Sequence, residues 1–132
     1  MTIGYGTTLR NNRMNAVTTA VNASGQATLE MFSGTRPSFG GTAGALLVTL
    51  NMNTTPFGAS VAGKITANTI EPEEAVADGT AQWFRISTGS GTAIIDGDIG
   101  LVGSGADIEM TSVTVSTGLI VALSSLSITE GN

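Results

Sequence analysis

The sequence predicts an all-β fold: a β-sandwich, with a jelly roll as one form, preceded by one short N-terminal α-helix. A length of 132 residues suits one domain. After Gly25, about seven or eight short segments alternate apolar and polar residues, and Gly, Pro, Asn or Ser bounds each of them. Only the stretch before Gly25 shows helical spacing. We therefore expect an N-terminal arm at 1–8 and a single sandwich domain at 9–132, with a helix at about 9–22 and strands from about 27 onward.

The helix is predicted by apolar residues spaced three and four positions apart. A Thr side chain can accept a hydrogen bond from the free amides of a first turn, so Thr7 or Thr8 is the expected cap. Gly25 is expected to end the helix in the left-handed backbone conformation that glycine favours there. The many Asn and Thr residues give this segment poor helix propensity, so packing must hold it in place. The expected stripe consists of Leu9, Met14, Val17 and Val21, with Ala16 and Ala20.

A β-hairpin at 80–99 is the clearest predicted strand pair. Its two strands flank a Gly-rich turn, and pairing Ser87 with Thr92 would set Arg85 opposite Ile94. Further strands are expected at 27–32, 46–50, 62–68, 113–117 and 119–128. In the last of these the apolar phase switches at Ser124-Ser125. Either a β-bulge or a strand that passes from one sheet to another would explain the switch.

Composition excludes several classes of function. The chain has neither Cys nor His, which rules out disulfides, thiolate or imidazole metal sites and a histidine general base. A net charge of −5 argues against nucleic acid as a partner. The uncharged stretches alternate too much for a membrane helix, and the N-terminus lacks the apolar region of a signal peptide. We therefore expect a soluble protein that binds neither nucleic acid nor membrane.

Four carboxylates in the second half invite a chemical interpretation. Asp96, Asp98, Asp107 and Glu109 could form an oxygen-rich calcium site or an acid pair for glycoside hydrolysis. The EF-hand spacing is absent, however, and one Trp, one Tyr and four Phe provide few walls for a sugar cleft. The simpler alternative is that these acids lie on solvated strands and turns. We expect no catalytic residue, no cofactor and no metal.

The charges point to contact rather than catalysis. Only 11% of the residues are charged, which is little for the surface of a freely soluble monomer. All five basic residues precede Ile86, and the remaining chain carries five acids, so surfaces of opposite sign could dock subunits. Trp83 is either an interface anchor or a core residue, and the loop aromatics leave the same two alternatives open. The candidate interface residues are Arg10, Arg13, Arg36, Phe39, Phe57, Trp83 and Arg85.

Several short motifs resemble the head decoration, or capsid cement, proteins of tailed bacteriophages. They are Leu-Arg-Asn-Asn-Arg-Met at 9–14, Ser-Gly-Thr-Arg-Pro at 33–37, Pro-Phe-Gly-Ala at 56–59, Gly-Lys-Ile-Thr-Ala-Asn at 63–68, Gly-Thr-Ala-Gln-Trp-Phe-Arg at 79–85, Asp-Gly-Asp-Ile-Gly at 96–100 and Gly-Ala-Asp-Ile at 105–108. The resemblance covers about 9–129. These motifs are structural rather than catalytic.

The resemblance implies a structural virion protein and no enzyme. Such a protein would be made in the bacterial host cytoplasm, bind the outer capsid surface and reinforce contacts between major capsid subunits. Its partners would be the major capsid protein and itself, as a homotrimer in preference to a dimer. The alternative is a tail-associated or receptor- or glycan-binding β-sandwich module of a virion.

Overall fold

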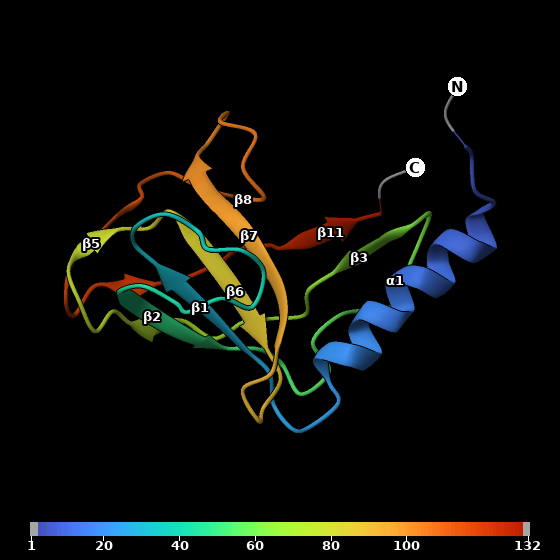
Figure 1. Ribbon diagram of the computed structural model, residues 1–132, viewed down its shortest axis with the longest axis horizontal. Coiled ribbons are helices and arrows are strands. Elements are labelled where there is room, and N and C mark those ends of the chain that lie inside the picture. The colour runs from blue at the N-terminus through green and yellow to red at the C-terminus, as the bar shows by residue number, and fades with distance from the viewer. Residues whose placement is uncertain (1–2, 131–132) are drawn as a thin grey trace.

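The computed structural model describes residues 3–130, which form a mostly β structure with one helix (Figure 1). A curled five-stranded sheet has the order β2-β1-β6-β7-β8, and three two-stranded ladders pair β4 with β10, β3 with β11 and β5 with β9. The elements are α1 (Thr7–Val21), β1 (Thr28–Phe32), β2 (Leu46–Asn51), β3 (Lys64–Thr66), β4 (Glu73–Glu74), β5 (Gly79–Thr80), β6 (Trp83–Ser87), β7 (Ala93–Leu101), β8 (Ile108–Met110), β9 (Thr114–Val115), β10 (Ile120–Val121) and β11 (Ser127–Thr129).

The large sheet is mixed because β8 runs parallel to β7 while the other neighbours are antiparallel. Parallel strands usually need a crossover of about a dozen residues or more, yet only residues 102–107 separate these two. The chain reverses through Gly103 and Gly105, both at positive φ. The Glu109 carboxylate accepts the N–H groups of both glycines, and these bonds lower the pKa of Glu109.

Helix α1 begins earlier than expected. Thr7 and Thr8 lie inside it, so they belong to neither a cap nor an arm, and Gly6 stands at the N-cap without a side-chain hydrogen bond among the described residues. The helix ends at Val21, and Gly25, at positive φ, lies in the turn that follows. Of the predicted arm, residues 3–6 precede the helix in non-regular conformation, and residues 1–2 lie outside the described range.

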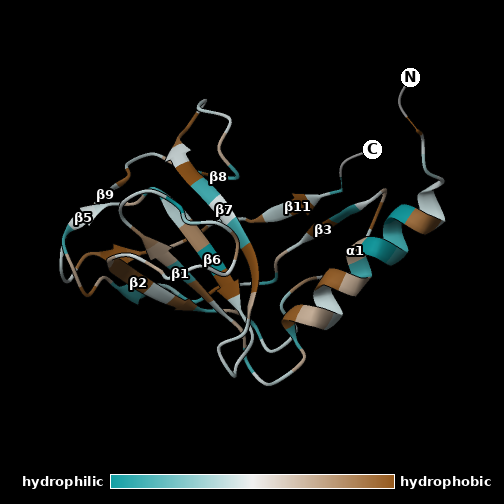
Figure 2. Ribbon diagram, in the orientation of Figure 1, coloured by the Kyte–Doolittle hydropathy of each residue, from teal (hydrophilic) through white to brown (hydrophobic). Residues whose placement is uncertain are grey.

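Two kinds of contact hold α1 against the β3 end of the molecule. Of the predicted apolar stripe, Met14 and Val21 are buried, whereas Leu9 and Ala16 are exposed. Asn11 Oδ1 accepts hydrogen bonds from the Ser60 hydroxyl and the Gly63 amide, and Asn15 Oδ1 accepts one from the Ser60 amide, so both side chains hold the turn at 60–63. These amides fasten a helix whose own propensity is poor. In Figure 2 the first half of α1 is mainly hydrophilic, whereas β1, β2 and β6 are mainly hydrophobic.

The β6–β7 hairpin exists, but its predicted register is wrong. Ser87 pairs with Ala93 rather than with Thr92, and the register then shifts before the next pair. The irregularity accommodates one extra residue on β7, so Arg85 faces Asp96 rather than Ile94. A pairing of opposite charges thereby replaces the expected pairing of arginine with an apolar side chain.

The two faces of the sheet bury different residues. One face joins a contiguous hydrophobic core that extends from Met14 in α1 to Leu126 near the C-terminal end. Leu29 and Met31 of β1 pair with Ile86 and Phe84 of β6, and all four belong to this core. The alternate positions of β1 and β6, with Asp96 of β7, place Phe32, Trp83, Arg85 and Asp96 on the opposite face.

The C-terminal run forms short strands with different partners. The predicted strand at 119–128 is split: β10 pairs with β4 and β11 pairs with β3. The phase switch at Ser124-Ser125 therefore marks passage from one ladder to another, the second of the two alternatives. Glu73 and Glu74 form β4, the strand that pairs with β10.

Candidate interaction surface around the 33–45 loop

The connection between β1 and β2, residues 33–45, lies in front of β6 on the second sheet face (Figure 1). The Ser33 amide donates to the Ala45 carbonyl at 3.0 Å and closes the base of the loop. Farther out, the Gly41 amide donates to the Ser38 carbonyl at 2.8 Å. Four of the seven candidate interface residues lie in this loop or beneath it.

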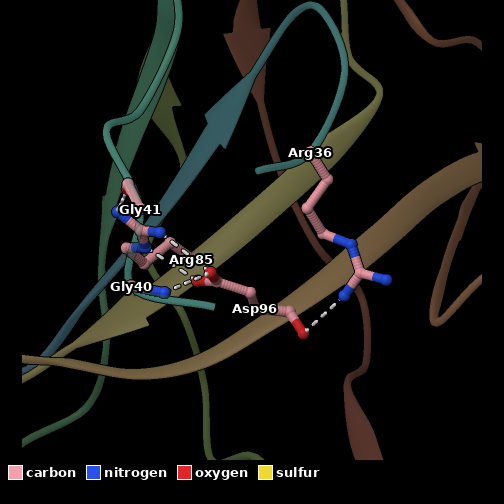
Figure 3. A network of polar contacts seen from close by, with 5 residues as sticks. All are labelled: Arg36, Gly40, Gly41, Arg85 and Asp96. Atoms are coloured by element: carbon pink, nitrogen blue, oxygen red, sulfur yellow. Dashed lines mark hydrogen bonds and ion pairs between the residues drawn. The ribbon is translucent and has the colours of Figure 1, made fainter. Parts of the chain in front are cut away.

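The pair Arg85–Asp96 fastens the loop to the sheet (Figure 3). Arg85 donates through Nε and Nη2 to the two Asp96 carboxylate oxygens at 2.7 and 2.8 Å. Its Nη1 donates to the Gly41 carbonyl at 2.9 Å, and the Gly40 amide donates to Asp96 Oδ2 at 3.2 Å. The Arg85 guanidinium, followed by the Gly40 amide, holds the pKa of Asp96 below its ordinary value. Their side chains are only 11% and 2% exposed, so this bidentate pair is shielded from water.

Arg36 adds a second, exposed attachment of the same loop. Its Nε lies 3.0 Å from Asp98 Oδ1. Its Nη1 donates to the Asp96 main-chain carbonyl at 3.2 Å, as Figure 3 shows. Because both side chains of the Arg36–Asp98 pair face water, this pair contributes little energy by itself. It does fix the approach of the loop to β7.

Phe39 is presented to solvent by this fastened loop. It precedes the two anchored glycines, and 65% of it is exposed. A large aromatic side chain held outward by an anchored backbone loses little conformational freedom when a partner covers it. Of the candidate residues, Phe39 best fits a contact role.

Trp83 and Phe57 lie inside the molecule instead. Trp83 is fully buried, stacks on Phe32 with ring centroids 4.4 Å apart and lies beneath the Arg85 guanidinium at 5.2 Å. Phe57 is 2% exposed and belongs to the hydrophobic core. Of the two alternatives left open for these side chains, burial in the single chain favours the core residue over the interface anchor, because neither side chain reaches the surface.

Arg10 and Arg13 lie elsewhere, where α1 meets Glu130. Their Nε atoms are 3.8 and 3.1 Å from the two Glu130 carboxylate oxygens, and the Glu130 side chain is only 3% exposed. The Arg13 guanidinium also lies 4.9 Å from the ring centre of Tyr5. The seven candidates thus divide between the loop, the core and the helix.

The four carboxylates singled out in the sequence do not converge on one point. Asp96 pairs with Arg85, and Asp98 pairs with Arg36. The Asp107 carboxylate accepts a hydrogen bond from the Asp98 amide at 2.9 Å, and the Glu109 carboxylate accepts one from the Gly103 amide. Within residues 3–130, three or more acids nowhere gather in a way that could hold a metal ion.

Sequence reasoning missed the partners that give these arginines their roles. Asp96 could have been found by testing shifted hairpin registers, because opposite charges favour cross-strand pairing. Glu130 gave no local signal, since it is more than a hundred residues away from α1 in the sequence. Only the pairing of β11 with β3 brings the two together.

Comparisons with known protein families, with curated protein sequences and with solved structures give no match. Across residues 3–130, no helix has the length and apolar character needed to cross a membrane.

Proposed function

We propose that this chain is a structural virion protein that binds the outer surface of a bacteriophage capsid and reinforces the contacts between major capsid subunits. The exposed Phe39 on its fastened loop is the observation that carries the proposal. The resemblance of the sequence motifs to phage decoration proteins supports the choice of partner, a homotrimer in preference to a dimer, and the site on the virion. The contact is structural, and catalysis has no part in it.

The loop is suited to a contact that forms only on an assembled surface. Phe39 and the uncharged residues around it offer apolar and small polar groups, while Arg36 and Asp98 provide a charged rim. A protein that binds the assembled shell, and not its separated subunits, stabilises the shell by mass action. Reinforcement then requires buried area across subunit joints and no reacting group.

A binding assay with purified particles tests the loop. Phe39→Ser should weaken binding to capsids at least about tenfold, because it removes a central aromatic contact. Val102→Ser is the matched control, since Val102 is 67% exposed but lies in the β7–β8 connection. Equal binding of wild type and Phe39→Ser would contradict the role of the loop.

Heating tests the reinforcement itself. Particles that carry the protein should release DNA at a higher temperature than particles without it. Release at the same temperature would contradict the proposed function even if binding were observed.

A tail-associated or receptor- or glycan-binding module is the second candidate, favoured by the same exposed aromatic. Phe39 could stack on a sugar ring as readily as it could fill a protein pocket. Saturable binding on a glycan array, lost in Phe39→Ser, together with no affinity for capsids, would support this alternative.

We further propose that the small ladders form the second layer of a β-sandwich over the core face of the large sheet. Core residues from β3, β9 and β10 belong to the same buried cluster as those of β1, β2 and β6, which supports the proposal. Phe84 of β6 and Leu126 beside β11 line one shared cleft of about 170 Å³. An experimental structure with β11 away from the β6–β7 core face would contradict it.

A further inference from the structure

One end of the molecule carries exposed apolar residues and positive charge. Ile3, Tyr5 and Leu9 are 71%, 40% and 48% exposed, and residues 3–6 extend from the start of α1. We call residues 3–6 the arm. Among residues 3–130, the charged side chains at this end are those of Arg10, Arg13, Lys64 and Glu130, three cations and one carboxylate.

The other end carries a groove with acidic residues beside it. The groove has a volume of about 570 Å³ and lies along β9 and β10. Leu119 and Ile120 in its lining are 47% and 57% exposed. Glu74 is the cross-strand partner of Ile120, and both are exposed. The stretches 69–82 and 111–123 contain four acids (Glu71, Glu73, Glu74 and Asp78) and no basic residue.

We propose that two copies of this chain associate head to tail, with the arm of one copy seated in the β9–β10 groove of the next. Ile3 and Tyr5 would cover Leu119 and Ile120, which otherwise stay in water. The cationic α1 end would face the acidic β4 end, which orients the approach.

The arm does not reach the groove of its own chain. Figure 1 shows α1 at one end of the longest axis and β5 at the other, and the groove-lining strand β9 pairs with β5. An arm of four residues spans at most about 14 Å when fully extended. A domain of this length has a radius of gyration of about 14 Å, so its two ends lie farther apart than the arm can bridge. The groove of a second copy is therefore the one the arm can fill.

Such an interface joins two different surfaces and is heterologous. It closes into a ring if the rotation between copies permits, and otherwise continues as an open chain. The contact involves neither Phe39 nor its loop. It can therefore be tested on the purified chain, and it stands or fails separately from capsid binding.

Sedimentation velocity of two complementary variants provides the test. The arm variant Ile3→Ser/Tyr5→Ser keeps the groove, and the groove variant Ile120→Lys keeps the arm. All three positions are exposed, so folding should persist, and circular dichroism verifies it. Wild type should form oligomers, and each variant alone should associate at least about tenfold more weakly.

Mixing the two variants should restore association but limit it to a 1:1 dimer, because one intact arm meets one intact groove and the remaining ends are defective. Val102→Ser, an equally exposed change outside both surfaces, should associate like wild type. A wild type that remains monomeric up to high concentration would overturn the proposal. So would a mixture of folded variants that fails to associate.

Charge reversal gives an independent check on the orientation. Glu74→Lys places a cation where the positive end of the next copy approaches, so association should weaken several-fold at low salt, and added salt should reduce the difference. Unchanged association of Glu74→Lys at low salt would contradict the charge argument.

Discussion

Asp96 and Glu130 are both buried carboxylates that lie beside two arginines, yet their surroundings differ. Asp96 accepts two parallel hydrogen bonds from Arg85 and a third from the Gly40 amide. Glu130 lies 3.1 and 3.8 Å from its arginines, and among the described residues neither of its oxygens accepts a well-aligned hydrogen bond. Both sites bring opposite charges close together, but only the Asp96 site has the geometry of a strong ion pair.

The difference indicates which of the two ion-pair sites should contribute more to the stability of the fold. A buried ion pair recovers its desolvation cost only when the geometry is good and the remaining lone pairs are satisfied. The Asp96 site meets this condition and fastens the loop that presents Phe39. The Glu130 site meets it poorly, so α1 and the arm should be the more easily displaced part of the molecule.

Removing Asp96 should have the largest effect on stability. Asp96→Ala leaves the buried Arg85 guanidinium without its carboxylate, which should lower the free energy of unfolding by about 3 kcal/mol. Urea denaturation measures this loss. A loss below about 1 kcal/mol would show that the pair is no stronger than a surface pair.

Removing the charge of Glu130 should cost less, about 1 kcal/mol, because its oxygens accept no well-aligned hydrogen bond from the described residues and both arginines can turn toward water. Hydrogen exchange should at the same time become faster in α1 than in β6. A loss equal to that of Asp96→Ala, measured for Glu130→Gln in the same urea series, would mean that the two sites do not differ.

Acid should weaken the Asp96 site in a defined direction. The folded-state pKa of Asp96 is lowered, so its contribution is fully present above the unfolded value of about 3.9 and is lost as the pH falls through the lower folded value. The stability difference between wild type and Asp96→Asn should therefore shrink below about pH 4. A constant difference between pH 6 and pH 3 would contradict this linkage.

The exposed pair Arg36–Asp98 should have the smallest effect. Arg36→Ala should change the unfolding free energy by about 0.5 kcal/mol or less, since water and salt screen the pair. A loss above about 1.5 kcal/mol would contradict the account of Arg36 as a screened surface contact.

The local pattern of apolar and polar residues predicted those elements that depend on neighbours in the sequence. Alternation placed β1, β2 and the β6–β7 hairpin, and the three-and-four spacing placed α1. The irregularity on β7 escaped prediction because one extra residue costs little and leaves no compositional trace. The division of the C-terminal run between β4 and β3 depends on tertiary pairing, which alternation alone does not specify.

The candidate site likewise contains residues that residue type could identify and residues whose position depends on strand pairing. Arg36, Phe39 and Arg85 were identified from residue type, and the structure places them together around one loop. For Trp83 and Phe57, residue type alone left interface and core open, because their burial depends on which strands pair and on which face each residue lies. Glu130 joins α1 only through the β3–β11 ladder, so the sequence could not connect them.

Cryo-electron microscopy of virions that contain this chain tests the central claim most directly. The account predicts density for the chain on the outer capsid surface, across joints between major capsid subunits, with the 33–45 loop and Phe39 at the contact. Density on the tail, or on the capsid with the loop facing solvent, would contradict it.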